Sequence, residues 1–404
     1  MKLSDIIHQV LPGRTSLGLE ITDTSIKLAE VVSAKNRQPE IRRVLTESLP
    51  PGVVEEGKLI RPLVVIQTLQ TMIHRAGIKT KRVHMVAPSQ MLMVRFLKMP
   101  DIPYKELSKV IDFEVKHNIH LPFENPYYDF MKLNGSNHSK GKRKTTAKLP
   151  AASEHAMAFN QAAAASDAGH YDLSNSRASL FDDYRQEQRN EGESPLSMPC
   201  DVMLVAAPKE LIDSYKEAAE AAGLKPAAME FKALSLFRLI EQEVADARSQ
   251  TLLVLDINET ASDMSIFHEG QLKITRSVPV SFAIMKDEEA DATIKPGFDL
   301  FAEFEQPSDN DGYGQAIGEL VHELERLMNF YRYTLNNRTQ QFSALYISGD
   351  VENADRIAET LKSRFSQPVV MIPLRSLKLN HPQLHDAALR CSVPIGLAIR
   401  RDRT

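Results

Sequence analysis

The sequence has few of the residues that mark secreted, metal-binding or membrane-spanning chains. Its 404 residues include two cysteines and no tryptophan, and neither Cys200 nor Cys391 belongs to a CxxC pair. Because a zinc site needs closely spaced ligands, cysteine-based metal binding is not expected. The low cysteine count favours a reduced, cytosolic compartment. Apolar runs fall short of the roughly 18 residues that a membrane-spanning helix needs, so no such helix is expected.

Common catalytic signatures are also missing. The chain has no P-loop, no dinucleotide-binding GxGxxG, no HExxH and no GxSxG. Its formal net charge of -4 gives no global reason to expect nucleic acid or a membrane as the main partner. Function therefore has to be sought in the order of the elements and in less common motifs.

Two stretches of the chain repeat one order of expected elements. In the first, alternating strands at 17–21 and 25–32 flank the polar turn 22–24, and a third strand at 41–49 and a helix follow. In the second, strands are expected at 252–255, 263–267 and 272–278, followed by a helix at 317–331. Such duplicated α/β halves predict two lobes with a cleft between them.

Changes in composition and pattern suggest where the domains begin and end. We expect a first subdomain at 1–91, a small inserted domain at 92–225, a return to the first subdomain at 226–251, and a second lobe at 252–404 with its own inserted subdomain at 281–335. Within the small domain, residues 134–198 are rich in Gly, Ser, Asn, Gln, Ala and charge. Such a segment cannot bury enough apolar surface to offset its ordering entropy, so a disordered insertion is expected.

Polar segments follow the first strand of each half and a strand near the C-terminus. A turn whose backbone N–H groups converge can hold phosphate, and glycine lets the backbone come close. The candidate nucleotide-binding residues are Thr22, Asp23, Thr24, Ser25 and Lys27 of the first segment, Asp256, Asn258, Glu259 and Thr260 of the second, and Gly349 and Asp350 of the third. In this order the segments resemble the two phosphate turns and the adenosine site of the actin-like ATPases.

Several longer motifs stand in the second unit and near the C-terminus. They are Arg95-Phe96-Leu97-Lys98-Met99-Pro100, the helical Glu106-Leu107 through Ile111 to Glu114, Leu121-Pro122-Phe123-Glu124, Asp129-Phe130, Ala206-Ala207-Pro208-Lys209-Glu210 and Gly396-Leu397-Ala398-Ile399-Arg400. They resemble motifs of the PilM family of type IV pilus assembly proteins. The similarity covers nearly the whole chain outside residues 134–198 and 286–314.

The resemblance implies a fold, a cofactor and a partner. The implied fold is α/β: bilobed and actin-like, with ribonuclease H-like duplicated halves and an inserted small α+β domain. The implied cofactor is ATP with Mg²⁺ in the cleft, and Asp256 is the candidate to hold the metal through water. The implied role is a cytoplasmic scaffold that captures the N-terminal peptide of a PilN-like inner-membrane protein, with other pilus assembly components as further candidate partners. Nucleic acid is not expected, and membrane contact is expected only indirectly, through partners.

The candidate cleft departs from the family pattern. Glu20 and Thr22 stand where the family has Asp and Gly, Asn258 replaces Gly, and Asp350 follows Gly349 in place of a second Gly. A side chain at a position where backbone meets phosphate blocks the approach, and an inward-pointing Asp350 would repel phosphate. We therefore predict weakened nucleotide binding and assign no catalytic residue, while ATP binding or weak ATPase activity stays open.

Four features have structural interpretations as well as functional ones. Lys27 is either a phosphate contact or an exposed strand lysine, and Asp256 is either a metal holder or a turn cap. The apolar face at 3–11 is expected to dock on the body of the protein rather than on a membrane. The basic run at 140–144 is expected to be solvated rather than bound to anionic lipid.

Three other functions fit parts of the sequence. An active ATPase or phosphotransferase, such as a sugar kinase, would need intact phosphate loops and a catalytic acid. A module like the secretion protein GspL would continue into a transmembrane helix, and the chain stops at Thr404 without one. The cell-division protein FtsA, whose fold is related, would place an amphipathic helix after Arg400. The pilus scaffold is therefore the preferred hypothesis.

Overall fold

The structure, a computed structural model, describes residues 14–34, 37–133, 199–282, 312–335, 337–380 and 384–400. The predicted disordered insertion at 134–198, the basic run inside it and the apolar segment at 3–11 lie outside the described residues. So do residues 283–311 of the predicted subdomain in the second lobe.

The first sheet is built around the N-terminal strand-turn-strand. Its strands are β1 (Arg14–Ile21), β2 (Ser25–Ser33), β3 (Glu40–Ser48), β6 (Arg82–Val86), β10 (Lys225–Glu230) and β16 (Lys378–Leu379). They stand in the order β10-β6-β1-β2-β3-β16. Strands β1, β2 and β3 are antiparallel neighbours, whereas β6 runs parallel to β1 and β10 runs parallel to β6. Most of β1 and β2 is buried, since helices cover both faces of this sheet.

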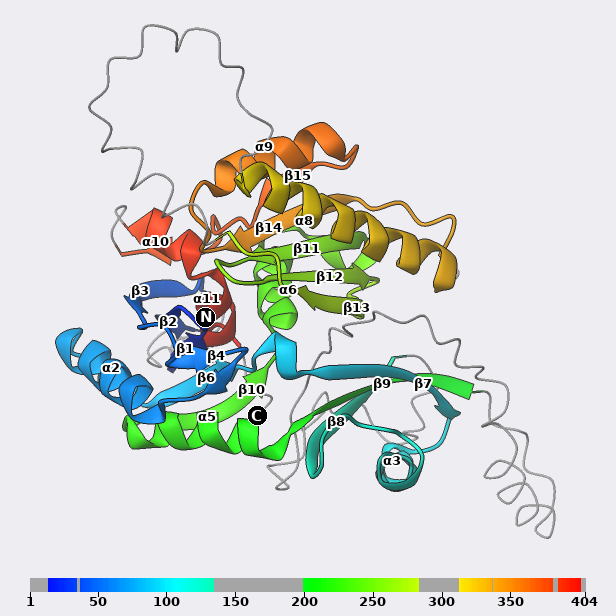
Figure 1. Ribbon diagram of the computed structural model, residues 1–404, viewed down its shortest axis with the longest axis horizontal. Coiled ribbons are helices and arrows are strands. Elements are labelled where there is room, and N and C mark those ends of the chain that lie inside the picture. Colours follow the sequence, from blue (N-terminus) through cyan, green and yellow to red (C-terminus); the bar gives the residue numbers. More distant parts are fainter. Residues whose placement is uncertain are drawn as a thin grey trace, which may run out of the picture.

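The second sheet repeats this arrangement. Its strands are β11 (Thr251–Ile257), β12 (Ser262–His268), β13 (Gln271–Val278), β14 (Ala344–Gly349) and β15 (Val369–Met371). They stand in the order β13-β12-β11-β14-β15, with an antiparallel meander followed by parallel strands (Figure 1). Strand β11 thus holds the place in its sheet that β1 holds in the first. The predicted duplication of two α/β halves is confirmed.

Helices fill the space around the first sheet and join it to the second. They are α2 (Pro62–Arg75), α5 (Lys209–Ala221), α6 (Lys232–Glu243), α10 (His385–Arg390) and α11 (Ser392–Ala398). Helix α11 packs on β1, β2 and β6, whereas α2 and α5 pack on each other. Helix α6 contacts α11 on one side and β11, β12 and β13 on the other, so it lies between the two sheets.

A close approach fixes α11 against the first sheet. A Cβ atom at Gly18 of β1 would lie 1.8 Å from the carbonyl oxygen of Pro394 in α11. Any larger residue would therefore push the helix outward. Leu17 and Leu19, the neighbours of Gly18 on β1, point to the opposite face of the sheet and are almost completely buried.

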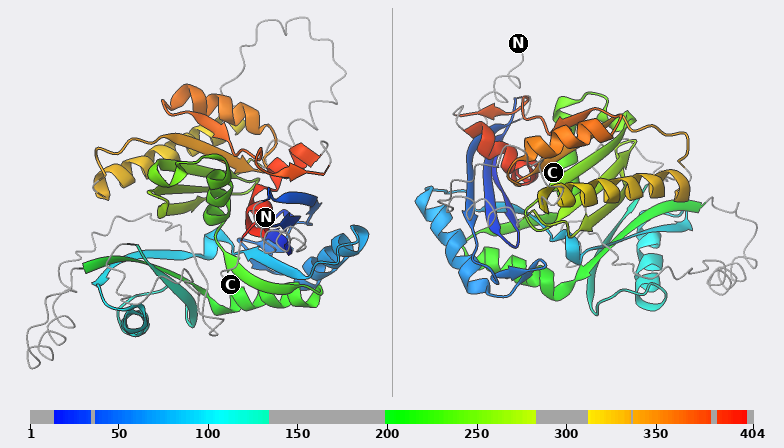
Figure 2. Two further views of the ribbon diagram at one scale, coloured as in Figure 1. Left: turned by 180° about the vertical axis from the view of Figure 1, so that it is seen from behind. Right: turned by 45° about the horizontal axis from the view of Figure 1, so that its top comes forward.

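A third, smaller unit projects from the first lobe (Figure 2). It consists of β7 (Met93–Pro100), β8 (Pro126–Lys132), β9 (Pro199–Pro208) and α3 (Tyr104–His117), with the strands in the order β7-β9-β8. Leu107 and Ile111 of α3 pack on Val202 and Leu204 of β9, so this unit has its own apolar core. The first lobe also carries the short hairpin β4 (Val54–Glu55) and β5 (Lys58–Leu59).

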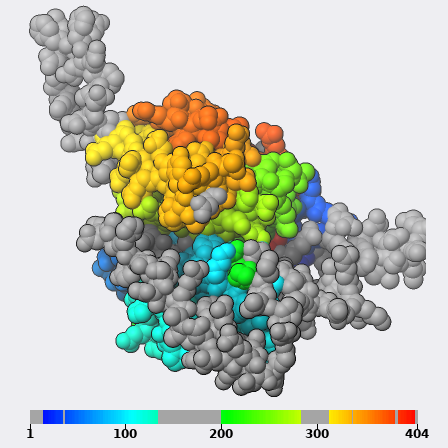
Figure 3. All heavy atoms as spheres, turned by 90° about the vertical axis from the view of Figure 1, so that its right-hand side faces the viewer, coloured from blue at the N-terminus to red at the C-terminus, as the bar shows by residue number. Residues whose placement is uncertain are grey.

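The second lobe is covered by two long helices. They are α8 (Gly312–Asn329), extended by the π-helical turn η4 (Phe330–Thr334), and α9 (Ala354–Arg364). Leu320, Leu324 and Leu327 repeat along α8 at helical spacing and are buried in the core of this lobe. Figure 3 shows the surface of both helices above that of the smaller unit. Within the described ranges, no helix combines the length and apolar character needed to cross a membrane.

Candidate functional site

The turn between β1 and β2 is closed by its own side chains. The backbone N–H of Ser25 donates to Oγ1 of Thr22 at 3.0 Å, and the N–H of Thr22 donates to the carbonyl of Ser25 at 2.9 Å. The carboxylate of Asp23 accepts hydrogen bonds from the N–H groups of Glu56 and Gly57 at 3.0 and 2.9 Å. Asp23 therefore ties the turn to the β4–β5 hairpin, whereas Ser25 faces the cleft.

Lys27, two residues into β2, is 1% exposed and lies at the centre of an ionic network. Its ammonium group is 3.4 Å from Glu20 of β1 and 2.8 Å from Asp350, and it donates to Oδ1 of Asn258 at 3.2 Å. The interpretation of Lys27 as an exposed strand lysine was wrong. Since Asn258 and Asp350 belong to the second lobe, this one side chain joins the two lobes across the cleft.

The second and third polar segments meet beside this lysine. Asn258 also donates from Nδ2 to the carboxylate of Asp256 at 2.7 Å, and its backbone N–H donates to the carbonyl of Ala261 at 3.0 Å. Gly349 has a φ of +125°, and a Cβ there would lie 1.8 Å from the carbonyl oxygen of Ile257. A glycine is therefore required where β14 pairs with Ile257 at the end of β11, and Asp350, the next residue, lines the pocket.

A second lysine, which was not predicted from the sequence, shares the carboxylate of Glu20 with Lys27. Lys232 begins α6, and its ammonium group is 3.2 Å from Glu20, 3.2 Å from Asp256 and 3.1 Å from Asp263. The signal in the sequence is a lone lysine between Phe231 and an apolar helical face. Its partners could not be found there, because they lie on β1, β11 and β12.

Burial and charge act in opposite directions on these groups. Burial on its own lowers the pKa of Lys27. The carboxylates of Glu20 and Asp350 raise it by more than burial lowers it, so the net pKa lies above its ordinary value. Burial likewise lowers the pKa of Lys232, and its three carboxylate partners raise it well above its ordinary value. For Asp256 burial raises the pKa, while Lys232 and Lys27 lower it to below its ordinary value. All three groups are therefore charged at neutral pH.

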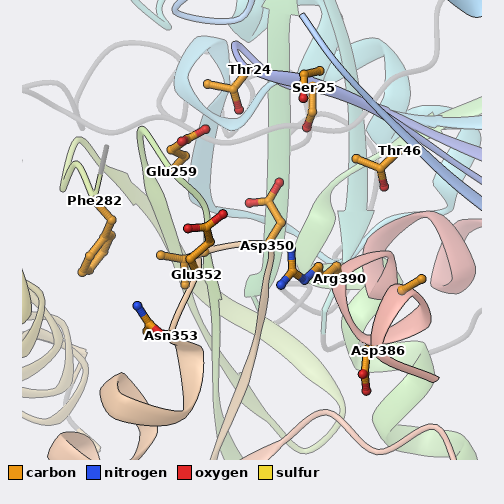
Figure 4. A pocket seen from close by; sticks show the side chains of 13 residues that line it. Thr24, Ser25, Thr46, Glu259, Phe282, Asp350, Glu352, Asn353, Asp386 and Arg390 are labelled. Atoms are coloured by element: carbon orange, nitrogen blue, oxygen red, sulfur yellow. The ribbon is translucent and has the colours of Figure 1, made fainter. Parts of the chain in front are cut away.

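An open pocket of about 480 Å³ lies next to the network, between the two lobes. Its lining includes Thr24 and Ser25 of the first turn, Glu259 of the second, and Asp350 of the third segment, so the structure brings the three predicted segments together (Figure 4). Figure 4 shows Arg390 reaching in from α10, on the side opposite Glu259. The remaining lining residues are Thr46, Ser48, Phe282, Val351, Glu352, Asn353, Asp386 and Ala387.

The charges of this pocket fit a nucleotide polyphosphate poorly. Its described lining carries four acidic residues, Glu259, Asp350, Glu352 and Asp386, and one basic residue, Arg390. Lys27, the predicted phosphate contact, is instead held by the carboxylates of Glu20 and Asp350. Bringing further negative charge next to these carboxylates is unfavourable.

Asp256 also fits a hydrated Mg²⁺ poorly. Its Oδ2 atom is already contacted by the ammonium of Lys232 at 3.2 Å and by the amide of Asn258 at 2.7 Å. Among the described residues, no group of His, Cys, Asp and Glu is arranged to hold a metal ion. Asp256 is 2% exposed, which leaves no room for a shell of water around it.

Comparisons with known proteins agree with the fold. The family model described as "Type IV pilus assembly protein PilM" matches residues 18–169. A solved structure described as a PilM-PilN type IV pilus biogenesis complex superposes with a TM-score of 0.67 and 20% identity, and the match covers 96% of this chain and 100% of that one.

Two more distant structures are similar in outline. The ethanolamine utilization protein EutJ from Carboxydothermus hydrogenoformans gives a TM-score of 0.45 at 10% identity, over 96% of this chain and 90% of its own. MreB5 of Spiroplasma citri, solved with ADP, gives 0.43 at 9% identity, over 95% of this chain and 94% of its own. At these scores the likeness carries no information about function.

These findings define the class of the protein. It has an actin-like α/β fold with two related lobes, as predicted. The resemblance to the PilM family, drawn from motifs in the sequence, is supported by the family match at residues 18–169, over which the chain is similar to PilM.

Proposed function

We propose that this protein is a scaffold of type IV pilus assembly that binds the N-terminal tail of a PilN-like membrane protein. The observation that carries the proposal is the match to the PilM-PilN complex, because it extends over the whole of that chain and 96% of this one. The match to the PilM family model at residues 18–169, which include the smaller unit's β7, α3 and β8, supports it independently. Other pilus assembly components are further candidate partners.

The smaller unit has the features that an extended peptide needs. In the described part of the chain, β7 and β8 each pair with β9 alone, so both have an unpaired edge. An edge strand offers main-chain N–H and C=O groups to a peptide, and apolar side chains beside it give selectivity. Phe96 on β7 is 41% exposed and Met131 on β8 is 44% exposed, and both lie in register with Met203 of β9.

The cleft is proposed to bind nucleotide weakly. The ion pairs of Lys27 and the four acidic residues of the pocket support this part of the proposal. The candidate contacts remain the residues predicted from the sequence, of which Thr24, Ser25, Glu259 and Asp350 line the pocket. An active ATPase or phosphotransferase is not favoured, since it would have to place phosphates against these carboxylates.

The same proposal includes the cellular place and the domain plan. A cytoplasmic protein held at the inner membrane through its partner needs no membrane segment of its own. The proposed division at residues 91/92, 225/226 and 251/252 assigns the smaller unit of β7, α3, β8 and β9 to the partner and the two lobes to the cleft. It also includes α5 in the inserted segment, although that helix packs on α2 of the first lobe. Secretion modules of the GspL type are the alternative that shares this plan.

A peptide titration tests the scaffold function. A fluorescent peptide with the N-terminal tail sequence of a PilN-like protein from the same genome is titrated with the full chain and followed by anisotropy. We expect saturable binding that a scrambled peptide does not show. Phe96→Asp should weaken it at least tenfold, whereas Phe330→Asp, at an equally exposed phenylalanine of the second lobe (44%), should not. Absence of binding by the wild type would refute the scaffold function.

A further inference from the structure

The end of α8 that carries η4 exposes a group of apolar side chains. Phe330, Tyr333 and Leu335 are 44%, 61% and 38% exposed. Three of the ten large apolar side chains that the described part of the chain exposes therefore stand within six residues. Tyr331 between them is fully buried and packs on the ring of Phe342, which anchors this turn to the core of the second lobe. Apolar groups gathered on a well-packed helix end indicate a contact surface.

The same end of the helix is basic. Residues 326–341 include three arginines, Arg326, Arg332 and Arg338, and no aspartate or glutamate. Glu323, three residues before Arg326, is already held by Arg276 at 3.1 Å and by Arg326 at 2.6 Å. Within the described ranges, Arg332 and Arg338 form no ion pair with a carboxylate. These two arginines and the three exposed apolar side chains form a surface that we call the α8 patch, and its charge complements an anionic partner.

The α8 patch lies on the side of the molecule to which the smaller unit projects. In Figures 1 and 2 the end of α8 and the smaller unit stand on the same side of the two lobes. Figure 3 looks onto this side and shows the second lobe's helices above the smaller unit. Under the proposed function the smaller unit holds the tail of a membrane protein, and each residue of an extended tail spans at most about 3.6 Å. A short tail therefore brings this side close to the bilayer.

Aromatic and arginine side chains suit the surface of a bilayer. Aromatic rings concentrate at the level of the lipid headgroups, and arginines are attracted to the anionic lipids of the cytoplasmic leaflet. Each arginine near such a surface strengthens binding by about fivefold. The same groups could bind an acidic protein, but their place beside the unit that holds the membrane protein's tail favours lipid.

We propose that the α8 patch binds the headgroups of anionic membrane lipids and thereby orients the scaffold on the inner membrane. The inference rests on the proposed capture of a membrane protein's tail. A single weak contact with a membrane is easily reversed, whereas two linked contacts hold a protein stably. The tail supplies the first contact and the α8 patch the second.

Vesicle sedimentation tests the proposal in the absence of the tail peptide. The full chain is mixed at low salt with vesicles of equal parts phosphatidylglycerol and phosphatidylcholine, or of phosphatidylcholine alone. We expect at least tenfold stronger binding to the anionic vesicles, most of which is lost in about 0.5 M NaCl because salt screens the arginines. Equal binding to both kinds of vesicle would overturn the proposal.

A pair of matched variants assigns the binding to the α8 patch. Tyr333→Asp/Arg338→Glu should lower the affinity for anionic vesicles at least tenfold. Arg61→Glu/Leu63→Asp makes the same change in charge at two exposed residues beside α2, on the far side of the first lobe, and should bind like the wild type. All four side chains are exposed, so thermal unfolding should be the same in both variants. Equal loss of vesicle binding in both would contradict a specific patch.

Two further outcomes would overturn the proposal. Alanine at residues 140 and 142–144 removes the basic run of the sequence. If that change abolishes the preference for anionic vesicles and the variant of the α8 patch does not, the run and not the patch binds lipid. Light scattering tests the other occupant, since a mass that doubles with concentration in the wild type but not in Tyr333→Asp/Arg338→Glu would place a second copy of the chain on the patch.

Phe96→Asp separates this proposal from the scaffold function. It should lose the tail peptide and keep its binding to anionic vesicles, whereas Tyr333→Asp/Arg338→Glu should do the reverse. Vesicle binding that fails while the peptide still binds overturns the membrane contact alone. Peptide binding that fails while the vesicles still bind overturns tail capture alone.

Discussion

The ammonium group of Lys27 and the carboxylate of Asp350 lie 2.8 Å apart, although β2 and the end of β14 belong to different lobes. An open pocket lies between the two lobes, and beside it these two side chains of the protein meet across the cleft. The structure therefore holds its lobes together with its own charges. Substitutions at Lys27 and Asp350, and at Gly349 and His84 elsewhere in the two lobes, should have distinct effects on stability and ligand binding.

Loss of the central lysine should destabilise the fold strongly. Lys27→Met leaves the buried carboxylates of Glu20 and Asp350 without this cation, and breaking a buried ion pair in this way costs about 3–5 kcal/mol. Urea denaturation of the full chain measures the free energy of unfolding. Lys216→Met removes an exposed lysine as the control and should change it by less than about 0.5 kcal/mol. Equal effects of both substitutions would contradict the network.

Asp350 should act as a barrier to nucleotide. Asp350→Gly removes a carboxylate from the pocket, releases Lys27 from one ion pair and restores the Gly-Gly pattern of the third segment. We expect at least tenfold tighter binding of Mg-ATP by titration calorimetry than in the wild type. Asp386→Gly is the control, since it removes another acidic side chain from the lining and leaves the ion pairs of Lys27 intact. It should increase the affinity for Mg-ATP by less than Asp350→Gly does. Low-micromolar affinity in the wild type would refute a weakened cleft.

Gly349 should tolerate no side chain. Its φ of +125° opposes Gly349→Ala, and so does the distance of 1.8 Å that would separate the new Cβ atom from the carbonyl oxygen of Ile257. The backbone strain alone costs about 1–3 kcal/mol, and separation of β14 from β11 adds to it. Gly318→Ala, in open space on α8, should instead stabilise the protein by about 0.5–1 kcal/mol. Thermal unfolding of both variants distinguishes the two effects, and a neutral Gly349→Ala would argue against this close approach.

His84 should make the fold sensitive to acid. Burial, together with the guanidinium groups of Arg400, Arg82 and Arg238, lowers the pKa of His84 from 6.5 to about 4, against the hydrogen bond to the carbonyl of Leu397. Because the unfolded chain takes up this proton near pH 6.5 and the folded chain only near pH 4, the stability contributed by neutral His84 is present above pH 6.5 and lost as the pH falls between these values.

Between pH 6.5 and pH 4, protonation of His84 should lower the free energy of unfolding by about 3 kcal/mol. Urea denaturation at a series of pH values measures it. His84→Gln carries no titrating group and should lack this part of the pH dependence, while keeping the part due to carboxylates. Identical pH profiles of the wild type and the variant would show that His84 does not titrate in this range.

The order of the elements could be predicted because it is encoded locally. Alternation of apolar residues marks β1, β2, β11 and β12, and the helical repeat of Leu320, Leu324 and Leu327 marks α8. Each polar segment directly follows a strand, and Thr24, Ser25, Glu259 and Asp350 of these segments line one pocket. The structure brings Asn258 and Asp350 together beside Lys27, as the duplicated halves required.

The charges inside the cleft could not be predicted in this way. Lys27 lies on a strand in which apolar and polar residues alternate, and that pattern does not show that its side chain is buried. Its contacts in the second lobe, Asn258 and Asp350, lie more than two hundred residues away in the chain. Lys232 has its partners on three strands, which sequence spacing does not relate. Asp23 was predicted to contact phosphate, but its carboxylate binds the backbone of Glu56 and Gly57.

The sharpest single test is the affinity of the wild type for the N-terminal tail peptide of the PilN-like protein, measured in Mg-ATP and again in EDTA without nucleotide. A scaffold whose lobes are joined by Lys27 and Lys232 should bind the peptide with the same affinity in both. Absence of binding in both conditions would contradict the scaffold, and binding that requires Mg-ATP would contradict lobes that are held together by their own lysines.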